Sequence, residues 1–157
     1  MTEIQSVSVR NYEPMHQPWF EGLNRAWIEE YFFMEEIDLE ILQHPDKHIL
    51  DQGGVILMAY LGDEVAGTVA LKFVTGGVYE FTKMAVDPKF RRQKIGTMLA
   101  NTAIEQAKKL KASKVVLYSS TKLENALALY RGIGFTEVPV DRRYQRSDIK
   151  MELNLQD

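Results

Sequence analysis

The segment that most constrains the fold is residues 78–110, in which a strand pattern passes through a short basic turn into a long amphipathic helix. Residues 78–86, VYEFTKMAV, have the pattern of a strand that stops at Asp87 and Pro88. The helix that follows is predicted over residues 95–110, where one face carries Ile95, Leu99, Ala103, Ala107 and Leu110. A strand that leads directly into a helix favours an α/β domain.

Patterns elsewhere predict the remaining elements. Apolar residues at helical spacing predict helices over residues 19–33, 36–42 and 123–133, and strand-like runs cover residues 4–11, 55–61, 64–74, 115–118, 135–138 and 149–155. The second helix should end near His44, because Pro45 disfavours helical geometry at the residue before it. Gly134 stands where a C-terminal cap is favoured. This order of elements predicts an α/β domain with a mixed sheet and helices on both faces, and we expect residues 1–157 to form one domain.

The composition excludes several classes of function. Hydrophobic residues make up 45% of the 157 residues and charged residues 26%, as in ordinary globular proteins. The formal charge of −3 argues against general affinity for nucleic acid, because proteins that bind the phosphate backbone usually carry a basic excess. No cysteine is present, which excludes disulfides, thiolate nucleophiles and zinc–thiolate sites. His44 and His48 are separated by Pro45 and lack the glutamate of a metalloprotease motif, so we expect no metal.

The N-terminus and the apolar runs bear on location. Residues 1–10, MTEIQSVSVR, lack the apolar core of a signal peptide. The longest purely apolar run, residues 55–61, is far shorter than the roughly 20 residues that span a bilayer. We therefore expect a cytoplasmic protein with no membrane partner, and the absence of cysteine fits a reducing compartment.

The basic turn KFRRQK, residues 89–94, has two interpretations. The first free N–H groups of the following helix should point out near the end of the strand, and the helix dipole together with Arg91, Arg92 and Lys94 would attract a diphosphate there. The alternative is a solvated charge cluster or a small nucleic-acid patch. No GxGxxG or P-loop string occurs in the chain.

This turn resembles the coenzyme A diphosphate loop of the GNAT superfamily of N-acetyltransferases. The family's loop has Gln or Arg, two free residues, Gly, one free residue, then Gly or Ala; Arg91 and Gly96 match, and Lys94 replaces the first Gly. A side chain at a position of positive φ would cost about 1 kcal/mol. The resemblance implies that acetyl-CoA is bound by the loop residues Arg91, Arg92, Gln93, Lys94, Ile95, Gly96 and Thr97.

A second match to the same family lies downstream, in NALALYRGIGF, residues 125–135. The matching positions are Asn125, Ala128, Leu129, Tyr130, Gly134 and Phe135. The resemblance implies a GNAT-like mixed, mostly antiparallel central sheet and an N-acetyltransferase that uses acetyl-CoA. It also implies that the backbone of Met84, Ala85 and Val86 runs beside the pantetheine arm, while Asn125 could contact that arm, cap its helix or lie at the surface.

Two titratable residues are candidates for the chemistry. Glu80 lies in the strand before the turn, where many family members carry an acidic residue, and it would take the proton of an amine whose pKa in water is near 10.4. The alternative for Glu80 is a solvent-facing residue or an ion-pair partner of Lys83 or Lys72. Tyr130 coincides with the tyrosine that acts as the family's general acid; its alternative is a core aromatic residue.

The acceptor is not identified by the sequence. The acidic residues of the first two predicted helices, Glu29, Glu30, Glu35, Glu36, Asp38 and Glu40, form either a solvated helix face or a negative border that favours a cationic amine. With no cysteine to carry an acetyl group, we expect direct transfer to a small-molecule or peptide amine. The alternatives are a non-catalytic acyl-CoA sensor and a basic-patch interaction protein, and a homodimer through sheet edges is plausible.

Overall fold

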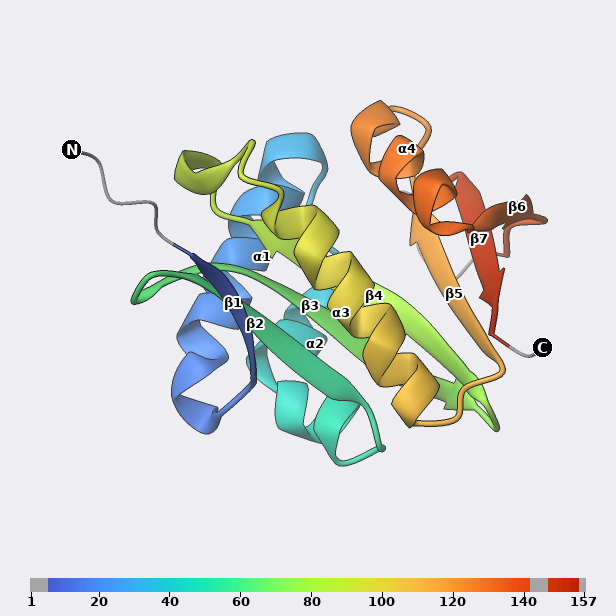
Figure 1. The fold of residues 1–157 in the computed structure, drawn as a ribbon, viewed down its shortest axis with the longest axis horizontal. Helices are drawn as coiled ribbons and strands as arrows, with labels where there is room; N and C mark the ends of the chain where they lie inside the picture. The colour runs from blue at the N-terminus through green and yellow to red at the C-terminus, as the bar shows by residue number, and fades with distance from the viewer. Residues whose placement is uncertain (1–5, 142–146, 156–157) are drawn as a thin grey trace.

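A seven-stranded sheet with the order β1-β2-β3-β4-β5-β7-β6 forms the framework of the computed structural model, which describes residues 6–141 and 147–155 (Figure 1). Its strands are β1 (Val7–Asn11), β2 (Val55–Leu61), β3 (Glu64–Thr75), β4 (Val78–Val86), β5 (Lys114–Ser119), β6 (Thr136–Val138) and β7 (Ile149–Asn154). Among the described residues, β4 and β5 pair in parallel and every other neighbouring pair is antiparallel. The predicted mixed, mostly antiparallel sheet is confirmed.

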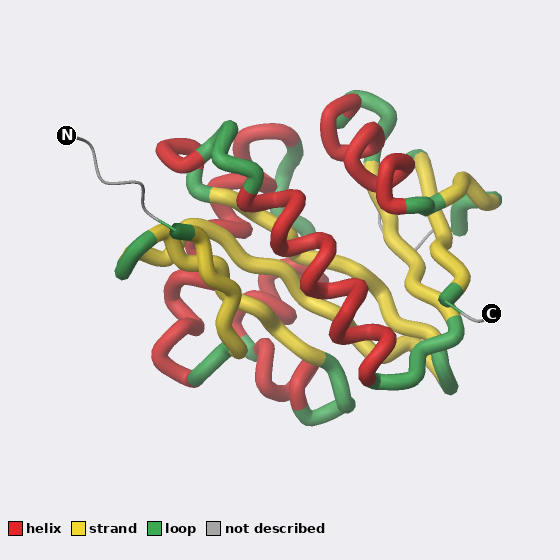
Figure 2. Tube along the Cα trace, viewed as in Figure 1, coloured by secondary structure: helices red, strands yellow, loops and turns green. Residues whose placement is uncertain are grey.

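Helices cover both faces of this sheet (Figure 2). They are α1 (Gln17–Tyr31), α2 (Glu36–Gln43), α3 (Ile95–Lys109) and α4 (Glu124–Ile133). In Figure 1, α3 and α4 lie in front of the sheet, and α1 and α2 lie behind it. The first helix begins two residues earlier than predicted, because Pro18 is tolerated in a first helical turn, where its missing N–H is not needed. No helix among the described residues combines the length and the apolar character that a bilayer crossing requires.

Three short helical turns were not predicted: η1 (Pro14–His16), η3 (Pro88–Phe90) and the longer η2 after α2. After α2 ends at Gln43, as the position of Pro45 indicates, the π-helical segment η2 (Asp46–Leu50) follows at once. Its Ile49 is fully buried against the core behind the sheet. The segment is too short for the spacing of its apolar residues to distinguish it from a loop.

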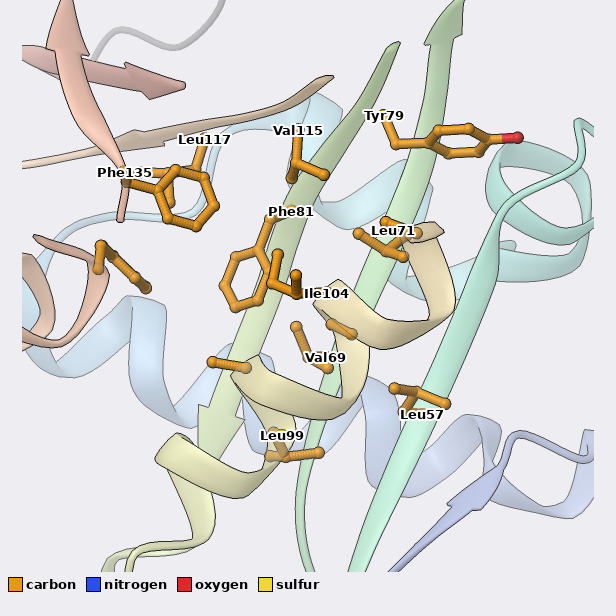
Figure 3. Close-up of a cluster of buried hydrophobic side chains, with 14 of the residues drawn as sticks. Leu57, Val69, Leu71, Tyr79, Phe81, Leu99, Ile104, Val115, Leu117 and Phe135 are labelled. Carbon is orange, nitrogen blue, oxygen red and sulfur yellow. The ribbon is translucent and has the colours of Figure 1, made fainter. Parts of the chain in front are cut away.

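Two hydrophobic cores hold the layers together. The core in front of the sheet joins α3 and α4 to the strands, and Figure 3 shows Phe81 of β4 between Ile104 of α3 and Phe135. The core behind the sheet is smaller and is built on Phe20 and Ile28 of α1. Successive side chains of a strand point to opposite faces of the sheet, so the same strands contribute residues to both cores.

A glycine in β3 sets how closely α3 approaches the sheet. A Cβ atom at Gly67 would lie 3.0 Å from the carbonyl oxygen of Ala85 and 3.1 Å from Leu99 Cδ1. These distances are shorter than ordinary van der Waals contact, so a larger residue at this position would displace its neighbours by a few tenths of an ångström. The close approach fixes the first turns of α3 beside the end of β4.

The start of α1 is anchored by a buried histidine. The Nδ1 atom of His16 accepts a hydrogen bond of 2.9 Å from the N–H of Glu13, and its Nε2 lies 2.6 Å from the Tyr60 hydroxyl. Burial lowers the pKa of His16, which favours the neutral ring that these two contacts require. The contacts tie the beginning of α1 to β2.

Candidate active site

The parallel strands β4 and β5 pair over a short stretch and then diverge. Their register runs from Val78 opposite Lys114 to Glu80 opposite Val116, whereas β4 continues to Val86. Figure 1 shows the two strands separating beyond this point. The divergence exposes the edge of β4 in the middle of the sheet.

A cavity of about 130 Å³ lies where the strands diverge. It is lined from behind the sheet by Asn24, Trp27, Ile28 and Phe32, and from the front by Leu123, Ala126 and Tyr130. Strand residues complete it: Glu80, Phe81, Thr82, Lys83 and Met84 from β4, and Leu117, Tyr118 and Ser119 from β5. The cavity therefore connects the two faces of the sheet, so a group that enters from behind can meet one that enters from the front.

Glu80 reaches the cavity from behind the sheet. Its neighbours Tyr79 and Phe81 belong to the front core, so the alternation along β4 directs Glu80 toward α1. The side chain is 1% exposed, and the alternative of a solvent-facing residue is therefore wrong. Of the two lysines proposed as ion-pair partners, Lys83 contacts Asp38, and Lys72 lies opposite Glu80 in the register of β3 and β4.

Tyr130 reaches the same cavity from the front. Its ring packs at 5.7 Å from that of Phe81 and at 6.0 Å from that of Phe135, measured between centroids. Burial raises the pKa of Tyr130 to about 12, because the phenolate would lose its hydration. Both interpretations of this residue thus describe its position: it packs as a core aromatic and also lines the cavity as a neutral phenol.

A β-bulge interrupts β4 between Glu80 and the end of the strand at Val86. Thr68 pairs with Ala85 and Ala70 pairs with Thr82, so β4 has one residue more than β3 over this stretch. Lys83 lies in the bulge with a φ of 56°, in the left-handed region. Its Nζ atom is 2.8 Å from Oδ1 of Asp38 on α2, and both side chains are buried. The ion pair holds the strained residue in place and ties α2 to β4.

The acidic residues of α1 and α2 are accordingly not one solvated face. Asp38 is fully buried and paired with Lys83, which corrects the expectation that it lies on an exposed acidic surface. Glu30 pairs with Arg91 at 2.9 Å, and Glu40 contacts His48 at 3.0 Å.

The basic turn before α3 carries two residues in left-handed geometry. Arg92 and Lys94 have φ values of 68° and 61°, and Lys94 is the N-cap of α3. The positive φ expected at Lys94 is confirmed. Alternating left- and right-handed residues turn successive N–H groups toward one point, an arrangement that binds anions. Ile95 is buried, so only its backbone could contribute, whereas the side chains of Gln93 and Thr97 are exposed.

Arg91 pairs with an acidic residue of α1, and Asn125 lies within α4 and not at its N-cap. The Arg91 guanidinium contacts Glu30 across the gap to α1. Asn125 is exposed in the first turn of α4, whose N-cap is Leu123, so the capping alternative is wrong. Beyond the bulge, Ala85 is buried and Met84 and Val86 pack against the front core. What these three residues could offer a ligand is therefore mainly their backbone.

Comparison with known proteins agrees with this geometry. The model of the acetyltransferase (GNAT) family matches residues 17–135, which include nearly all of the cavity lining, the basic turn and the whole of α4. The chain belongs to the GNAT acetyltransferase family. A curated relative, the uncharacterized N-acetyltransferase YvbK of Bacillus subtilis, is 31% identical over 113 residues, which are 70% of this GNAT chain and 73% of the relative.

Solved structures share the fold of this GNAT protein. A GNAT-family acetyltransferase from Staphylococcus aureus Mu50 superposes with a TM-score of 0.87 at 19% identity, covering 96% of this chain and 100% of the other. The PaiA N-acetyltransferase of Thermoplasma acidophilum, in complex with coenzyme A, has a TM-score of 0.73 at 18% identity and covers 95% and 99%. These likenesses extend over nearly the whole chain, including the ends where the sequence carries no motif.

Several residues of this GNAT site were not found from the sequence. Trp27 and Phe32 line the cavity, and their ring centroids are 5.9 Å apart. The Nζ atom of Lys122 lies 4.4 Å from the centroid of the Phe32 ring and donates a hydrogen bond to the Tyr31 carbonyl. Trp27 was assigned only to the apolar stripe of its helix. Trp27 lies next to Ile28 on the side of α1 that faces the sheet, and this position could have indicated that it lines the site.

Replacing Lys94 by glycine tests whether backbone or side chain holds the anion. We expect Lys94→Gly to raise the free energy of unfolding by about 1 kcal/mol, because glycine adopts positive φ without the steric penalty. Affinity for coenzyme A should fall by less than about fivefold, because a single exposed charge contributes little to the free energy of binding. Urea unfolding and a coenzyme A titration measure the two effects.

Lys111 provides the matched control for this substitution. It has nearly the same φ, 60°, at the opposite end of α3. Lys111→Gly should therefore give a similar stabilisation with no change in coenzyme A affinity. A loss of affinity of about a hundredfold or more in Lys94→Gly alone would assign the binding to the ammonium group instead.

Proposed function

We propose that this chain transfers an acetyl group from acetyl-CoA to a primary amine, directly and within a ternary complex. The observation that carries the proposal is the cavity between β4 and β5, which Glu80 lines from one face of the sheet and Tyr130 from the other. A transferase needs such an arrangement, because two substrates must meet with a base near one and an acid near the other. The chain has no cysteine to carry the acetyl group in between.

The cofactor would be held by residues that fit its chemistry. The left-handed turn at Arg92 and Lys94 and the first N–H groups of α3, from Ile95 to Thr97, offer donors and positive charge to a diphosphate. The β4 edge from Met84 to Val86 offers backbone groups to the amide-containing pantetheine arm, and Asn125 at the start of α4 could add a side-chain contact. When bound, acetyl-CoA supplies a thioester whose carbonyl carbon is the electrophile. The coenzyme A complex of the PaiA enzyme, a protein of the same fold, supports this assignment.

The chemistry assigned to the chain's own residues is acid–base catalysis. Glu80 takes one proton from the protonated amine and so frees its lone pair, and the nitrogen then bonds to the acyl carbon. Tyr130 donates its hydroxyl proton to the sulfur as the carbon–sulfur bond breaks, and the new amide nitrogen releases its extra proton to solvent. Solvent then removes the proton from Glu80 and returns one to Tyr130. The raised pKa of Tyr130 keeps this donor protonated through the physiological range.

Glu80→Gln tests the assignment of the base. An alkylamine has a pKa of about 10.4, so at neutral pH it is almost entirely protonated and depends on a base. We expect kcat/KM at pH 7 to fall by about a hundredfold, a typical share of general base catalysis. The deficit should shrink as the pH rises toward 10, where the amine loses its proton without help. A thiol-release assay with a panel of amines measures both effects.

Thr82 provides the comparison for Glu80. It lies two residues further along β4 and lines the same cavity without a titratable group. Thr82→Val should leave the dependence of the rate on pH unchanged. A deficit in Glu80→Gln that stays constant between pH 7 and 10 would remove Glu80 from the role of base.

A further inference from the structure

A groove of about 260 Å³ lies along the outer side of α1, beside the turn that follows β4. Its walls include Trp19, Leu23 and Trp27 from α1 and Pro88 from the turn. Gly22 and Ala26 lie one helical turn apart among these walls and leave space between them. A Cβ atom built at Gly22 has no other heavy atom within 4 Å. The small residues therefore leave a hollow between the two tryptophans.

The chemical character of the groove is apolar. Trp19 is 50% exposed and offers a large apolar surface to a ligand. The apolar walls are joined by three charged residues, Glu30, Asp87 and Arg91. Apolar walls with a small number of polar groups are typical of sites that hold the apolar body of a small molecule.

The groove adjoins the catalytic cavity, because Trp27 lines both. It opens on the side of the sheet that carries α1, from which Glu80 reaches the cavity. The helix α3, to whose first N–H groups we assign the diphosphate, packs on the opposite face. Val86 and Arg91, which we expect near acetyl-CoA, form the side of the groove toward the cofactor, and its α1 wall suits the acceptor amine.

The charged residues near the cavity and the groove disfavour an acceptor with several amino groups. Two carboxylates of α1 and α2 already have cationic partners within the chain: Asp38 lies 2.8 Å from Lys83, and Glu30 lies 2.9 Å from Arg91 at the groove. Asp87, which also lines the groove, accepts a hydrogen bond from the N–H of Lys89. A second ammonium group on the ligand would have to compete with Lys83 or Arg91 for the first two carboxylates. A single amine near Glu80 meets no such competition from either pair.

We infer that the acceptor is a primary monoamine on an apolar body, with the amine in the cavity beside Glu80 and the body in the groove between Trp19 and Trp27. This inference rests on the proposed function and narrows its substrate class. It assigns Gly22 and Trp19 to substrate specificity, a role that neither sequence motif of the family suggests.

The experiment compares three amines and fills the groove. Thiol release is measured with 4-phenylbutylamine as the long monoamine, n-propylamine as the short monoamine, and spermidine, for the wild type and for Gly22→Leu. The wild type should turn over the long monoamine with the highest catalytic efficiency. Gly22→Leu should weaken the apparent binding of the long monoamine by about tenfold, which corresponds to about 1.4 kcal/mol of lost apolar burial. Turnover of the short monoamine, which does not reach the groove, should change less than about twofold by the same reasoning, and this also shows that the variant is folded.

Gly132→Leu is the matched control. Gly132 is likewise an exposed helical glycine with no other atom within 4 Å of a Cβ, but it lies on α4, away from the groove. This variant should behave as the wild type with all three amines. The two substitutions introduce the same side chain, so a difference between their effects on turnover must come from the position of the substituted glycine.

Each other outcome counts against the inference. Equal effects of Gly22→Leu on the long and the short monoamine, or a wild-type preference for spermidine, would overturn it while leaving acetyl transfer intact. A raised KM for acetyl-CoA instead of the amine would assign the groove to the cofactor. No thiol release with any amine of the broader panel would overturn the proposed function as well.

Discussion

Tyr130→Phe is expected to lower kcat by about a hundredfold to a thousandfold, the usual range for the loss of a general acid. The phenylalanine ring keeps the contacts with Phe81 and Phe135, so the core around α4 should not change. The substitution removes only the hydroxyl group of a residue that lines the cavity. Affinity for acetyl-CoA should therefore stay within about twofold, because one neutral hydrogen bond contributes little to the binding of so large a ligand. Steady-state kinetics and a cofactor titration separate the two quantities.

Tyr79→Phe is the control for this prediction. Tyr79 lies on the same strand as Phe81, has the same exposed fraction as Tyr130, 9%, and does not line the cavity. Figure 3 shows its hydroxyl group pointing away from the other core side chains. If both variants keep the wild-type rate, Tyr130 is not the acid. If both lose it equally, the loss reports a change in the core.

The raised pKa of Tyr130 makes a further part of the same prediction. Since the phenol stays protonated up to a pKa of about 12, it should cause no alkaline fall in rate below about pH 11. Its unfolded pKa is about 10, so its contribution to stability is constant below pH 10 and is lost as pH rises toward 12. Between these values the wild type should lose roughly 2–3 kcal/mol that Tyr130→Phe does not lose, which urea unfolding at pH 9 and pH 11.5 can measure.

The elements of the fold were predictable because their patterns are local. The strands at Val55–Leu61 and Val78–Val86 have the predicted ends, since Gly62 and the Asp87–Pro88 pair stop each run at once. Gly134 caps α4 with a φ of 123°, as its place after an apolar stripe indicates. Lys94 in left-handed geometry was predictable for a related reason: the surrounding loop motif defines a position that usually holds glycine.

The features that were not predicted depend on contacts between distant residues. The pair Lys83–Asp38 joins positions 45 residues apart, and neither residue alone differs from an ordinary surface charge in the sequence. The same holds for Arg91, whose partner Glu30 is 61 residues away. Alternation along β4 could have placed Glu80 opposite the face of Tyr79 and Phe81, but only the separation of β5 from β4 explains how it shares a cavity with Tyr130.

The buried pair gives the largest stability effect that we expect in this protein. Asp38→Ala would leave the ammonium group of Lys83, only 3% exposed, without the carboxylate that compensates its burial. Breaking a buried ion pair in this way typically lowers the free energy of unfolding by about 3–5 kcal/mol. Asp38 also accepts a hydrogen bond from the N–H of Glu35 at the start of α2, so part of the loss belongs to helix capping. Urea unfolding measures the total.

Two further variants separate the charge from the other contributions. Glu30→Ala breaks an ion pair of similar length whose two side chains are more than 40% exposed, and it should cost less than about 1 kcal/mol. Asp38→Leu combined with Lys83→Met removes both buried charges and should recover at least half of the loss, because apolar pairs replace buried ion pairs well. If the double variant is no more stable than Asp38→Ala, the charge of Lys83 is not what Asp38 compensates. If it is stable but slow, the ion pair serves to hold the β4 bulge in the shape that catalysis needs.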